Sequence, residues 1–410
     1  MPNLRSVAIV GQGYVGLPLA IEAAKSGLSV VGLDVSETRV TTLNEGSSHI
    51  EDVKDEVLRE VIAGASYRAS TNGVDAADAD VVVICVPTPL YGKSDPDLSF
   101  VESAVRMVAT HLKPNALLVS ESTSYPGTVR ELIKPLVESL RDDNGLGIRY
   151  ASAPERVDPM NPKWDMKSTP RLVAGLTEEA TELAHEFYSS FCDTVIKVSS
   201  PEVAESAKLL ENTFRQVNIA LINQLVPFCR SLGIDVREVI EAAGSKPYGF
   251  MKFFPGAGVG GHCIPIDPLY LLWRSRQLGI DLPFVESADK TNREMPKYVA
   301  NRLIDLAGLS SGDKALIIGV AYKAGISDVR ESPASDVASH LISKGVEVFW
   351  LDPLVSEFEV GKKWDSSISV KGAIVVTAQP DLGVETITSA GVPVLDCTGA
   401  YKGIKGVTQL

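Results

Sequence analysis

SVAIVGQGYVGLPLA, residues 6–20, joins a predicted strand at Ser6–Val10 to a predicted helix at Leu17–Ser26. The turn between them fits the pattern Gly-x-Gly-x-x-Gly. The first glycine allows a tight turn, the second lets a pyrophosphate approach the backbone, and the third lets the helix pack on the sheet. Asp34 ends the next predicted strand, Leu28–Leu33, at the position of an acid that binds a ribose. The segment therefore predicts a doubly wound αβ domain that binds a dinucleotide.

The dinucleotide is predicted to be NAD, because a 2′-phosphate on the ribose would meet the carboxylate of Asp34. Arg39 leaves minor NADP use open, since an arginine here could receive that phosphate or cover the adenine. A glycine turn that binds no nucleotide is the alternative for the whole motif. The predicted cofactor contacts in this region are Gly11, Gly13, Tyr14, Val15, Gly16, Asp34 and Arg39.

Continuous Val/Ile runs, typical of strands buried on both faces, continue this rhythm. Further strands are predicted at Asp80–Val86, Ala116–Ser120, Arg149–Ala153, Arg171–Ala174 and Val195–Val198. From Pro201 the pattern is helical, and Glu202–Leu232 predicts one long helix in which Pro227 is a kink or a break. A loop at Lys246–Pro268 and more helix at Leu269–Leu306 follow.

The strand–helix rhythm returns near Lys314, with a helix predicted at Pro333–Ser343. The predicted strands there are Ala315–Val320, Val346–Leu351, Ala373–Thr377 and Val392–Leu395. The two ends of the chain look architecturally alike without a sequence repeat. We therefore predict domains at residues 1–200, 201–306 and 307–410.

Composition excludes several classes of protein. A net charge of −13 over 410 residues argues against nucleic-acid binding and against a polybasic membrane anchor. The five cysteines are scattered without a CxxC pair, which predicts a reducing cytoplasm and no metal site. The amino-terminal residues run directly into a strand pattern, so no signal peptide is predicted. The most apolar stretch, Val217–Cys229, is too short to span a bilayer.

Three loops follow predicted parallel strands and carry polar groups. Thr88 lies in Val-Pro-Thr-Pro, Thr123 in Glu-Ser-Thr-Ser-Tyr-Pro-Gly-Thr, and Glu155 in Ala-Pro-Glu-Arg. Ligands bind at the carboxyl ends of such strands, so these side chains are predicted to point toward the nicotinamide. For Thr88 or Thr123 alone, a turn or cap residue is an equally good interpretation.

A loop at Phe254–Cys263 contains four glycines in six residues. Such a backbone suits close contact with a ligand and offers peptide N–H groups to phosphate. Cys263 ends the loop, and Asp267 follows four residues later. Buried packing explains the other four cysteines well, whereas Cys263 is a better candidate for a nucleophile.

Lys208 is a candidate for the cation that such a thiol needs, and Asn212 shares its predicted helix face. A solvated surface lysine is the alternative. His262 is interpreted as a loop histidine that contacts substrate or backbone, rather than as a catalytic group.

The chain resembles the UDP-sugar dehydrogenase family, which includes UDP-glucose, UDP-N-acetylglucosamine and UDP-N-acetylmannosamine 6-dehydrogenases. The resemblance covers nearly the whole chain and rests on the segments GQGYVGLPLA, VPTP, STSYPGT, KLLENTFRQVNIALINQL, GVGGHCIPIDP and GVAYKAGISDVRESP, in that order. It implies an α/β fold of two Rossmann-like doubly wound domains joined by a central helical domain with a long helix. It also implies a homodimer through the central helices.

The resemblance further implies a four-electron oxidation of the sugar C6 hydroxyl through a thiohemiacetal and a thioester on Cys263. Lys208 and Asn212 would stabilise oxyanions, and Asp267 and Thr123 would position or activate water, with Glu155 a further base. Thr88, Thr123 and Arg330 would contact NAD. The implied UDP-sugar contacts are Glu155, Arg156, Lys208, Asn212, Phe253, Phe254, Gly256, Gly258, Gly260 and Lys323.

One departure bears on the sugar. UDP-glucose enzymes carry a second glutamate four residues after the first, whereas Pro159 stands there in this chain. This puts the hydrolytic base in doubt and argues against UDP-glucose. GGHCIPIDPLYL and PERVDP look most like the UDP-N-acetylglucosamine enzymes, so the predicted product is UDP-N-acetylglucosaminuronate. UDP-N-acetylmannosamine, UDP-N-acetylgalactosamine and UDP-glucose remain alternative substrates.

Two other classes compete with this interpretation. A single-step hydroxyacid dehydrogenase shares the first domain and a helical lysine, but needs neither the cysteine loop nor a third domain. A non-catalytic nucleotide-binding regulatory protein would not need Lys208, Asn212, Cys263 and Asp267 together.

Overall fold

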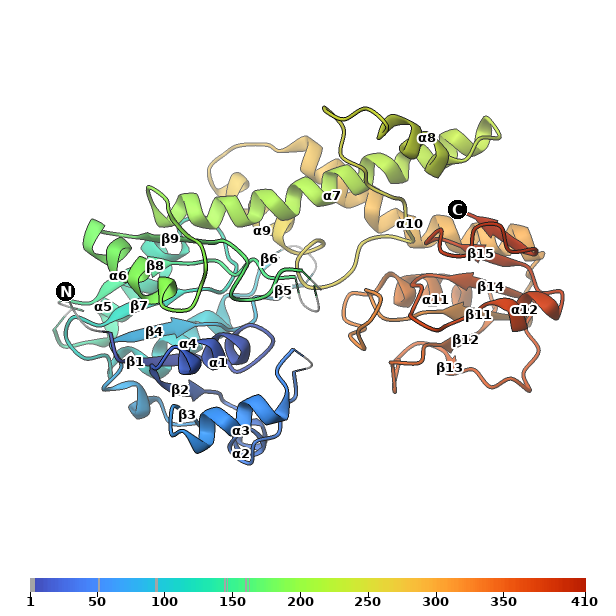
Figure 1. The fold of residues 1–410 in the computed structure, drawn as a ribbon. Coiled ribbons are helices and arrows are strands. Elements are labelled where there is room, and N and C mark those ends of the chain that lie inside the picture. Colours follow the sequence, from blue (N-terminus) through green and yellow to red (C-terminus); the bar gives the residue numbers. More distant parts are fainter. Residues whose placement is uncertain are drawn as a thin grey trace. The chain divides into compact units, whose positions relative to one another are not determined.

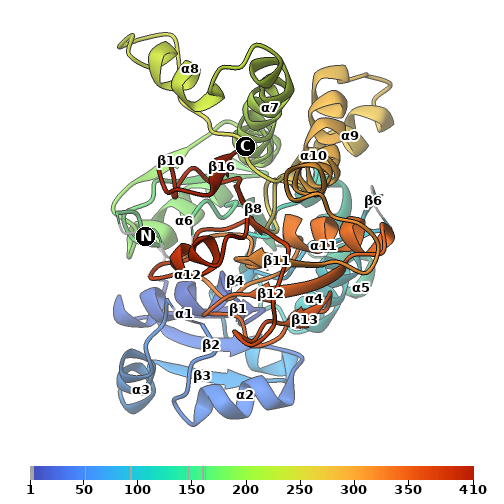
Figure 2. The same ribbon diagram turned by 90° about the vertical axis from the view of Figure 1, so that its right-hand side faces the viewer.

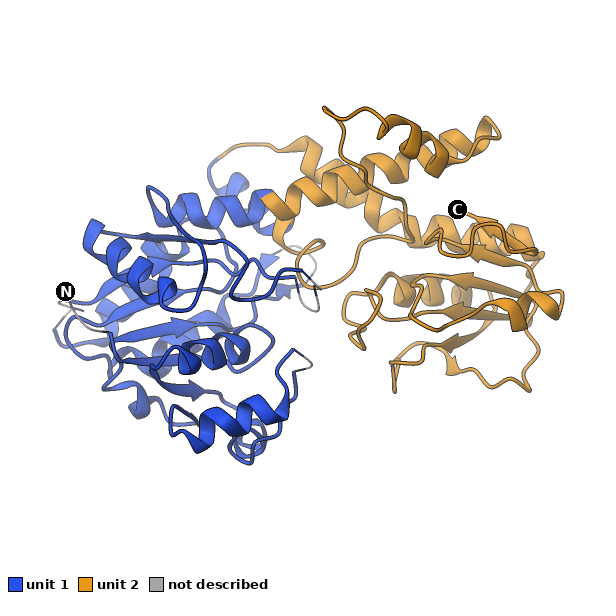
Figure 3. Cartoon of the chain, in the orientation of Figure 1, with its two compact units in different colours: residues 1–210, 269–278 blue, residues 211–268, 279–410 orange. Residues whose placement is uncertain are grey.

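The computed structural model of the protein describes residues 4–50, 52–92, 95–143, 145, 147–158, 161 and 163–410, so Pro159 lies outside it. The chain forms two compact units (Figure 3). Unit 1 comprises Met1–Leu210 with Leu269–Leu278, and unit 2 comprises Glu211–Pro268 with Gly279–Leu410. Because these units cut across the central helices, the three predicted domain boundaries stay a prediction.

Unit 1 is built on an eight-stranded sheet in the order β10-β9-β8-β7-β4-β1-β2-β3 (Figure 1). The strands are β1 Ser6–Val10, β2 Ser29–Leu33, β3 Tyr67–Ser70, β4 Val81–Ile84, β7 Leu117–Ser120, β8 Arg149–Ser152, β9 Arg171–Gly175 and β10 Val195–Lys197, with a small hairpin of β5 Leu90–Tyr91 and β6 Asp95–Pro96. The pairs are parallel except that β9 runs antiparallel to β8. The strands predicted here are confirmed to within two residues at each end.

Helices cover both faces of this sheet. Alternate residues of β1 enter different cores, with Val7 and Ile9 on one face and Ala8 and Val10 on the other. One face packs against α1 Gly16–Lys25, α3 Asp55–Ala63 and α6 Glu178–Ser189, and the other against α4 Ser99–Ala109, the π-helix η2 Val129–Ile133 and α5 Lys134–Leu140. Helix α2 Glu37–Asn44 and the short η1 Gly73–Ala76 complete the unit. Burial on both faces explains why β4 reads as an uninterrupted apolar run, VVVI.

Unit 2 contains a six-stranded parallel sheet in the order β13-β12-β11-β14-β15-β16. Its strands are β11 Lys314–Ile318, β12 Glu347–Leu351, β13 Lys362–Lys363, β14 Gly372–Val375, β15 Val394–Asp396 and β16 Val407–Gln409. Helices α10 Pro283–Ala307 and α11 Pro333–Ser343 pack on one face, and α12 Glu385–Ser389 packs on the other (Figure 2). The two predicted doubly wound domains are therefore confirmed.

The predicted long helix is confirmed as α7, Pro201–Ser231, and Pro227 lies inside it without ending it. Helix α8 Val236–Ala243 and a long loop follow. The helix predicted at Leu269–Leu306 is two helices, α9 Asp267–Gln277 and α10, because the chain turns at Gly279 with a φ of +70°. No helix within the described residues has the length and apolar character needed to cross a membrane.

Candidate active site

The glycine turn has the geometry that its sequence predicts. Gly11 has a φ of +93°, and its N–H donates to the carbonyl oxygen of Leu33 at 2.7 Å. A Cβ on Gly16, the first residue of α1, would lie 1.8 Å from the carbonyl oxygen of Gly11. A Cβ on Gly13 would meet nothing within 4 Å. The fold itself therefore requires glycine at the first and third positions, whereas Gly13 borders open space where a ligand can approach.

The first turn of α1 fits a bound pyrophosphate. Its N-cap is Val15, which makes no side-chain capping hydrogen bond, and no acidic residue lies in that turn. The N–H of Leu17 donates to the carbonyl oxygen of Gly13 at 3.1 Å. Helix N-termini usually satisfy their first N–H groups with a polar side chain, and phosphate can take that place. Tyr14 beside this turn is 41% exposed. These observations agree with an NAD-binding turn.

Asp34 and Arg39 form an ion pair at 2.9 Å. The buried carboxylate of Asp34 also accepts the N–H groups of Gln12 at 2.9 Å and Ser36 at 3.0 Å. A carboxylate offers about four acceptor positions, so one remains for a ribose hydroxyl. The structure thus joins the two residues that favour opposite choices between NAD and NADP.

The three predicted strand-end loops lie at one edge of the sheet, because β4, β7 and β8 are parallel neighbours. Ser122 Oγ links two of them, accepting the N–H of Val86 at 2.9 Å and donating to its carbonyl oxygen at 2.8 Å. Thr88 and Thr123 are half-buried in these loops. The structure therefore places these two loops side by side, while the contacts of Thr88 and Thr123 with NAD stay predictions.

Glu155 and Arg156 follow β8. Glu155 is 9% exposed, and its Oε1 accepts the N–H of Val157 at 2.5 Å. Arg156 turns its guanidinium back to the protein and donates to the carbonyl oxygen of Pro170 at 2.9 Å. The low exposure of Glu155 is what we expect of a functional acid.

Helix α9 contacts the same loops within unit 1. Tyr270 donates to the carbonyl oxygen of Pro89 at 3.2 Å. The rings of Tyr125 and Trp273 lie 5.0 Å apart, and Arg274 pairs with Glu131 at 2.5 Å. Helix α9 begins four residues after Cys263 along the chain. Sequence reasoning did not assign these contacts.

Glu205 is a buried acid that the sequence did not single out. From α7 it accepts the N–H groups of Gly127 at 2.7 Å and Val129 at 3.3 Å. It is 6% exposed, and this burial raises its pKa to about 8, against the lowering effect of the two N–H groups. Glu205 therefore joins the helix that carries Lys208 to the loop that carries Thr123.

Glu205→Gln is expected to flatten the dependence of stability on pH. Between its ordinary pKa of 4.5 and about 8, the folded protein keeps a proton that the unfolded chain releases. This contribution is complete below pH 4.5 and is lost as pH rises through about 8, on the order of 5 kcal/mol at most. Urea midpoints at about pH 5 and pH 9 measure it.

Glu202→Gln is the matched control, one helical turn away. Its pKa is lowered by a hydrogen bond from Arg130, so its contribution appears as pH rises and has the opposite sign. A Glu205→Gln variant with the same pH slope as the unmodified protein would contradict the assignment.

Cys263 begins a tight turn in unit 2, where its carbonyl oxygen accepts the N–H of Asp267 at 2.9 Å. Cys263 is exposed, whereas the other four cysteines are buried. Asn212 Nδ2 donates to Asp267 Oδ2 at 2.5 Å, and Arg215 Nη2 donates to Asn212 Oδ1 at 2.8 Å. Asn212 and Asp267 are both 3% exposed. The structure thus brings the predicted Asn212 and Asp267 together and adds Arg215, which sequence reasoning missed.

Lys208 is 7% exposed on α7, one turn before Asn212. Its burial excludes the alternative of a solvated surface lysine. Burial of an amine costs hydration free energy, so a buried lysine is expected to have a functional role.

The glycines of the cysteine loop have reasons within the protein. A Cβ on Gly260 would lie 2.8 Å from the carbonyl oxygen of Glu331, and one on Gly258, at a φ of +140°, 3.3 Å from that of Asn292. The N–H of Gly256 donates to Asn223 Oδ1 at 3.1 Å. Protein packing therefore explains much of the glycine content, and the contacts of Gly256, Gly258 and Gly260 with UDP-sugar stay predictions.

The two phenylalanines of this loop differ. Phe253 is half-buried with its ring 5.8 Å from that of Phe214, whereas Phe254 is 43% exposed. The guanidinium of Arg237 lies 5.6 Å from the Phe254 ring and donates to the carbonyl oxygen of Pro255 at 3.2 Å. Phe254 is thus the more exposed of the two rings, and Arg237 lies over it.

Lys323 and Arg330 follow β11. Lys323 is half-buried, and Arg330 pairs with Asp328, whose Oδ1 accepts its Nε at 2.8 Å. His262 stands near this pair, and loss of solvation together with the charge of Arg330 lowers its pKa.

Unit 2 repeats the glycine–aspartate arrangement of unit 1. Gly319, after β11, has a φ of +74°, and its N–H donates to the carbonyl oxygen of Leu351 at 2.8 Å. Asp352, after β12, accepts the N–H of Val320 at 2.9 Å, as Asp34 accepts that of Gln12. Sequence comparison missed this repeat, because the second turn lacks the glycine spacing of the first.

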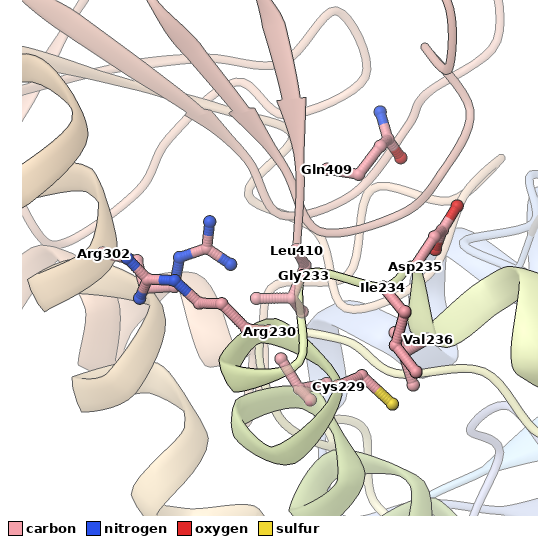
Figure 4. A pocket seen from close by; sticks show the side chains of 10 residues that line it. Cys229, Arg230, Gly233, Ile234, Asp235, Val236, Arg302, Gln409 and Leu410 are labelled. Carbon is pink, nitrogen blue, oxygen red and sulfur yellow. The ribbon is translucent and has the colours of Figure 1, made fainter.

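A cavity of about 350 Å³ lies elsewhere in unit 2 (Figure 4). It is lined by Val226, Cys229, Arg230, Gly233, Ile234, Asp235, Val236, Arg302, Gln409 and Leu410. None of these is a predicted catalytic or binding residue, so the cavity does not bear on the predicted reaction.

The models of one protein family match three consecutive segments of the chain. The models of the UDP-glucose/GDP-mannose dehydrogenase family match in order: its NAD binding domain at residues 5–192, its central domain at residues 202–305 and its UDP binding domain at residues 316–387. A UDP-N-acetyl-D-mannosamine dehydrogenase of Methanococcus maripaludis is 34% identical over 388 residues, 93% of this chain and 87% of that protein.

Solved structures agree. A UDP-D-ManNAc dehydrogenase from Pyrococcus horikoshii aligns with a TM-score of 0.88 at 31% identity, covering 98% of both chains. A UDP-glucose dehydrogenase from Pyrobaculum islandicum aligns with a TM-score of 0.87 at 27% identity, covering 99% of this chain and 97% of that one. Proteins named for different sugars thus share this architecture.

Proposed function

The chain belongs to the UDP-glucose/GDP-mannose dehydrogenase family, and on this premise we propose that it oxidises the C6 hydroxyl of UDP-N-acetylglucosamine to a carboxylate through Cys263. The family makes it an NAD-dependent UDP-sugar dehydrogenase, an oxidoreductase. The proposed mechanism rests on the exposed Cys263, which lies in one turn with Asp267. The carboxylate of Asp267 accepts a hydrogen bond from Asn212.

NAD, when bound, accepts one hydride in each of the two oxidations. The first oxidation makes an aldehyde, whose carbonyl carbon the thiolate of Cys263 attacks to form a thiohemiacetal. Loss of the second hydride leaves a thioester, and water then displaces the thiol to give the carboxylate. One alcohol, one water and two NAD⁺ would thus yield one carboxylate, two NADH and three protons.

The residues around Asn212 are held in place for charge stabilisation. Asn212 receives a hydrogen bond from Arg215 at Oδ1 and donates one to Asp267 at Nδ2, so its amide cannot rotate freely. A fixed donor loses little on reorganisation when negative charge develops, which is the general basis of oxyanion stabilisation. We assign Lys208 and Asn212 this role.

Hydrolysis of the thioester needs a base. The three candidates are Asp267, Thr123 and Glu155. Asp267 lies in unit 2 with Cys263, and Thr123 and Glu155 lie in unit 1. Pro159 replaces the second glutamate of UDP-glucose enzymes, so Glu155 or Asp267 must take over its share.

The sugar is the finer part of the proposal. The segments GGHCIPIDPLYL and PERVDP favour N-acetylglucosamine. N-acetylmannosamine is the second candidate, because two of the three relatives described above carry that sugar in their names. The two sugars differ only in the configuration at C2.

Counting NADH per sugar tests the proposal. The purified protein is mixed with NAD and a limiting amount of each UDP-sugar, and the absorbance of NADH is followed to completion. Two NADH with UDP-N-acetylglucosamine and little reaction with UDP-glucose are expected. Two NADH with UDP-N-acetylmannosamine alone would keep the mechanism and replace the sugar, and one NADH per sugar would overturn the covalent mechanism.

We also propose a cytoplasmic homodimer formed through α7. Phe214, Leu221 and Phe228 recur every seven residues on this helix and are 45%, 54% and 59% exposed. Apolar side chains at this spacing form a stripe that a second helix can cover. Sedimentation is expected to give twice the 43.8 kDa chain mass, and Leu221→Lys to shift it toward a monomer. A monomeric unmodified protein at micromolar concentration would refute the dimer.

A further inference from the structure

The reversed strand β9 brings an arginine to the edge where the predicted site lies. In the antiparallel pair, Ala151 faces Gly175 and Ser152 faces Ala174. Continuing this register places Glu155 opposite Arg171, the first residue of β9. A strand parallel to its neighbours would have started at the far edge. Strand direction therefore puts Arg171 beside the loops that follow β7 and β8.

Arg171 is buried between two carboxylates. Its side chain is 3% exposed, and its Nη1 lies 2.8 Å from Glu121 Oε1. Its Nη2 donates to Met166 Sδ at 2.8 Å and lies 3.9 Å from Glu155 Oε1, at ion-pair distance. Its guanidinium also lies 4.9 Å from the centre of the Tyr188 ring. Glu121 stands two residues before Thr123 in the sequence. The guanidinium of Arg171 therefore lies between the loop that carries Thr123 and Glu155.

Glu121 is itself anchored. Its side chain is fully buried, and its Oε1 accepts the hydroxyl of Tyr188 at 2.6 Å. Burial raises the pKa of Glu121, and the charge of Arg171 opposes that rise. A buried ion pair of this kind adds little net stability compared with apolar packing, since both charges lose their hydration. Fold stability alone is therefore a weak reason to place three charged side chains here.

The contacts of Glu155 leave one oxygen for chemistry. The N–H of Val157 and the guanidinium of Arg171 both approach Oε1. The hydrogen bond from Val157 fixes the rotation of the carboxylate, and the charge of Arg171 favours the same orientation from 3.9 Å. This leaves Oε2 as the oxygen to serve substrate or water. Small errors in such an orientation can cost about 10²-fold in rate.

We propose that Arg171, held by Glu121, is a positioning residue that orients Glu155 for the oxidation or hydrolysis step. This inference rests on the role that the proposed function gives to Glu155. Arg171 acts through Glu155 and has no contact of its own with the reacting atoms.

Arg171→Lys tests the proposal, because lysine keeps the charge but loses the planar fork that spans two carboxylates. We expect kcat to fall by about 10²-fold with little change in KM for NAD. Arg149→Lys is the matched control. Arg149 also begins a strand and pairs with a glutamate, Glu179, at 2.5 Å, but at the opposite edge of the sheet, so its kcat is expected to stay unchanged.

A double-mutant cycle separates positioning from a structural role. If Arg171 acts through Glu155, the double variant Arg171→Lys with Glu155→Gln is no slower than Glu155→Gln alone. Losses in kcat that multiply would overturn the proposal, as would an Arg171→Lys variant with unchanged kcat. If Arg171→Lys fails to fold by circular dichroism, Glu121→Gln replaces it in the same cycle, with the same expected non-additivity.

Failure of the proposed function is recognised separately. A Glu155→Gln variant at the unmodified rate would remove Glu155 from the mechanism and overturn the positioning role. Two NADH per sugar in the unmodified protein would still support the thioester chemistry. One NADH per sugar would refute that chemistry whatever the cycle shows.

Discussion

Cys263→Ser is expected to abolish carboxylate formation, with a loss of turnover on the order of 10³-fold or more. A serine hydroxyl is far less acidic than a thiol, so it supplies almost no nucleophile near neutral pH. Because Cys263 is exposed, the substitution removes no buried contact, and the free energy of unfolding is expected to stay the same within about 0.5 kcal/mol. NADH formation measures turnover, and calorimetric titration with NAD and UDP-sugar measures binding, which should be retained.

Cys229→Ser is the matched control for the chemistry of the substitution. Cys229 is 2% exposed and lies in the core of unit 2, so serine there is expected to lower stability and leave turnover per folded molecule unchanged. Full turnover in Cys263→Ser would show that no thioester forms at this residue. Loss of nucleotide binding in the same variant would show instead that the loop has been disturbed.

Gly16→Ala and Gly13→Ala are expected to separate folding from cofactor binding within one motif. The Cβ of alanine at residue 16 would lie 1.8 Å from the carbonyl oxygen of Gly11, which is backbone and cannot move aside cheaply. We expect unit 1 to lose about 3 kcal/mol or more of stability. At residue 13 the Cβ meets nothing within 4 Å, so stability should change by less than about 0.5 kcal/mol.

For Gly13→Ala we expect a large effect on NAD binding, in contrast to its small effect on stability. Its Cβ would occupy the space through which a pyrophosphate approaches the backbone, so we expect the dissociation constant for NAD to rise by about 10-fold or more. Thermal melting with and without NAD measures both effects, because a bound ligand raises the melting temperature by mass action. A Gly13→Ala protein that keeps the full NAD-induced shift would place the pyrophosphate elsewhere.

Local patterns were enough to predict the framework. The strand–turn–helix at residues 6–25 follows from apolar runs and glycine spacing, which act over a few residues. The long helix α7 was predicted correctly around Pro227, because helical periodicity on both sides of a proline outweighs one missing N–H. Very short strands such as β13 and β16 were not predicted, since two or three residues carry no periodicity.

The strand-end loops were predicted as a group for a topological reason. Parallel neighbours place their carboxyl ends at one edge, and β4, β7 and β8 are such neighbours. The reversal at β9 left no trace in the sequence, because an apolar strand reads the same in either direction. Arg171 therefore looked like an ordinary strand residue and was not predicted to reach the site.

The sequence by itself determined the fold class, the order of the parts, the glycine turn and the candidate set that includes Cys263, because each depends on neighbours close along the chain. Only the tertiary structure decided which side chains meet. Asn212 reaches Asp267 across 55 residues, and Gly127 donates to Glu205 across 78. Such contacts depend on how strands pair and helices pack, and no local pattern of residue types encodes a partner at that separation.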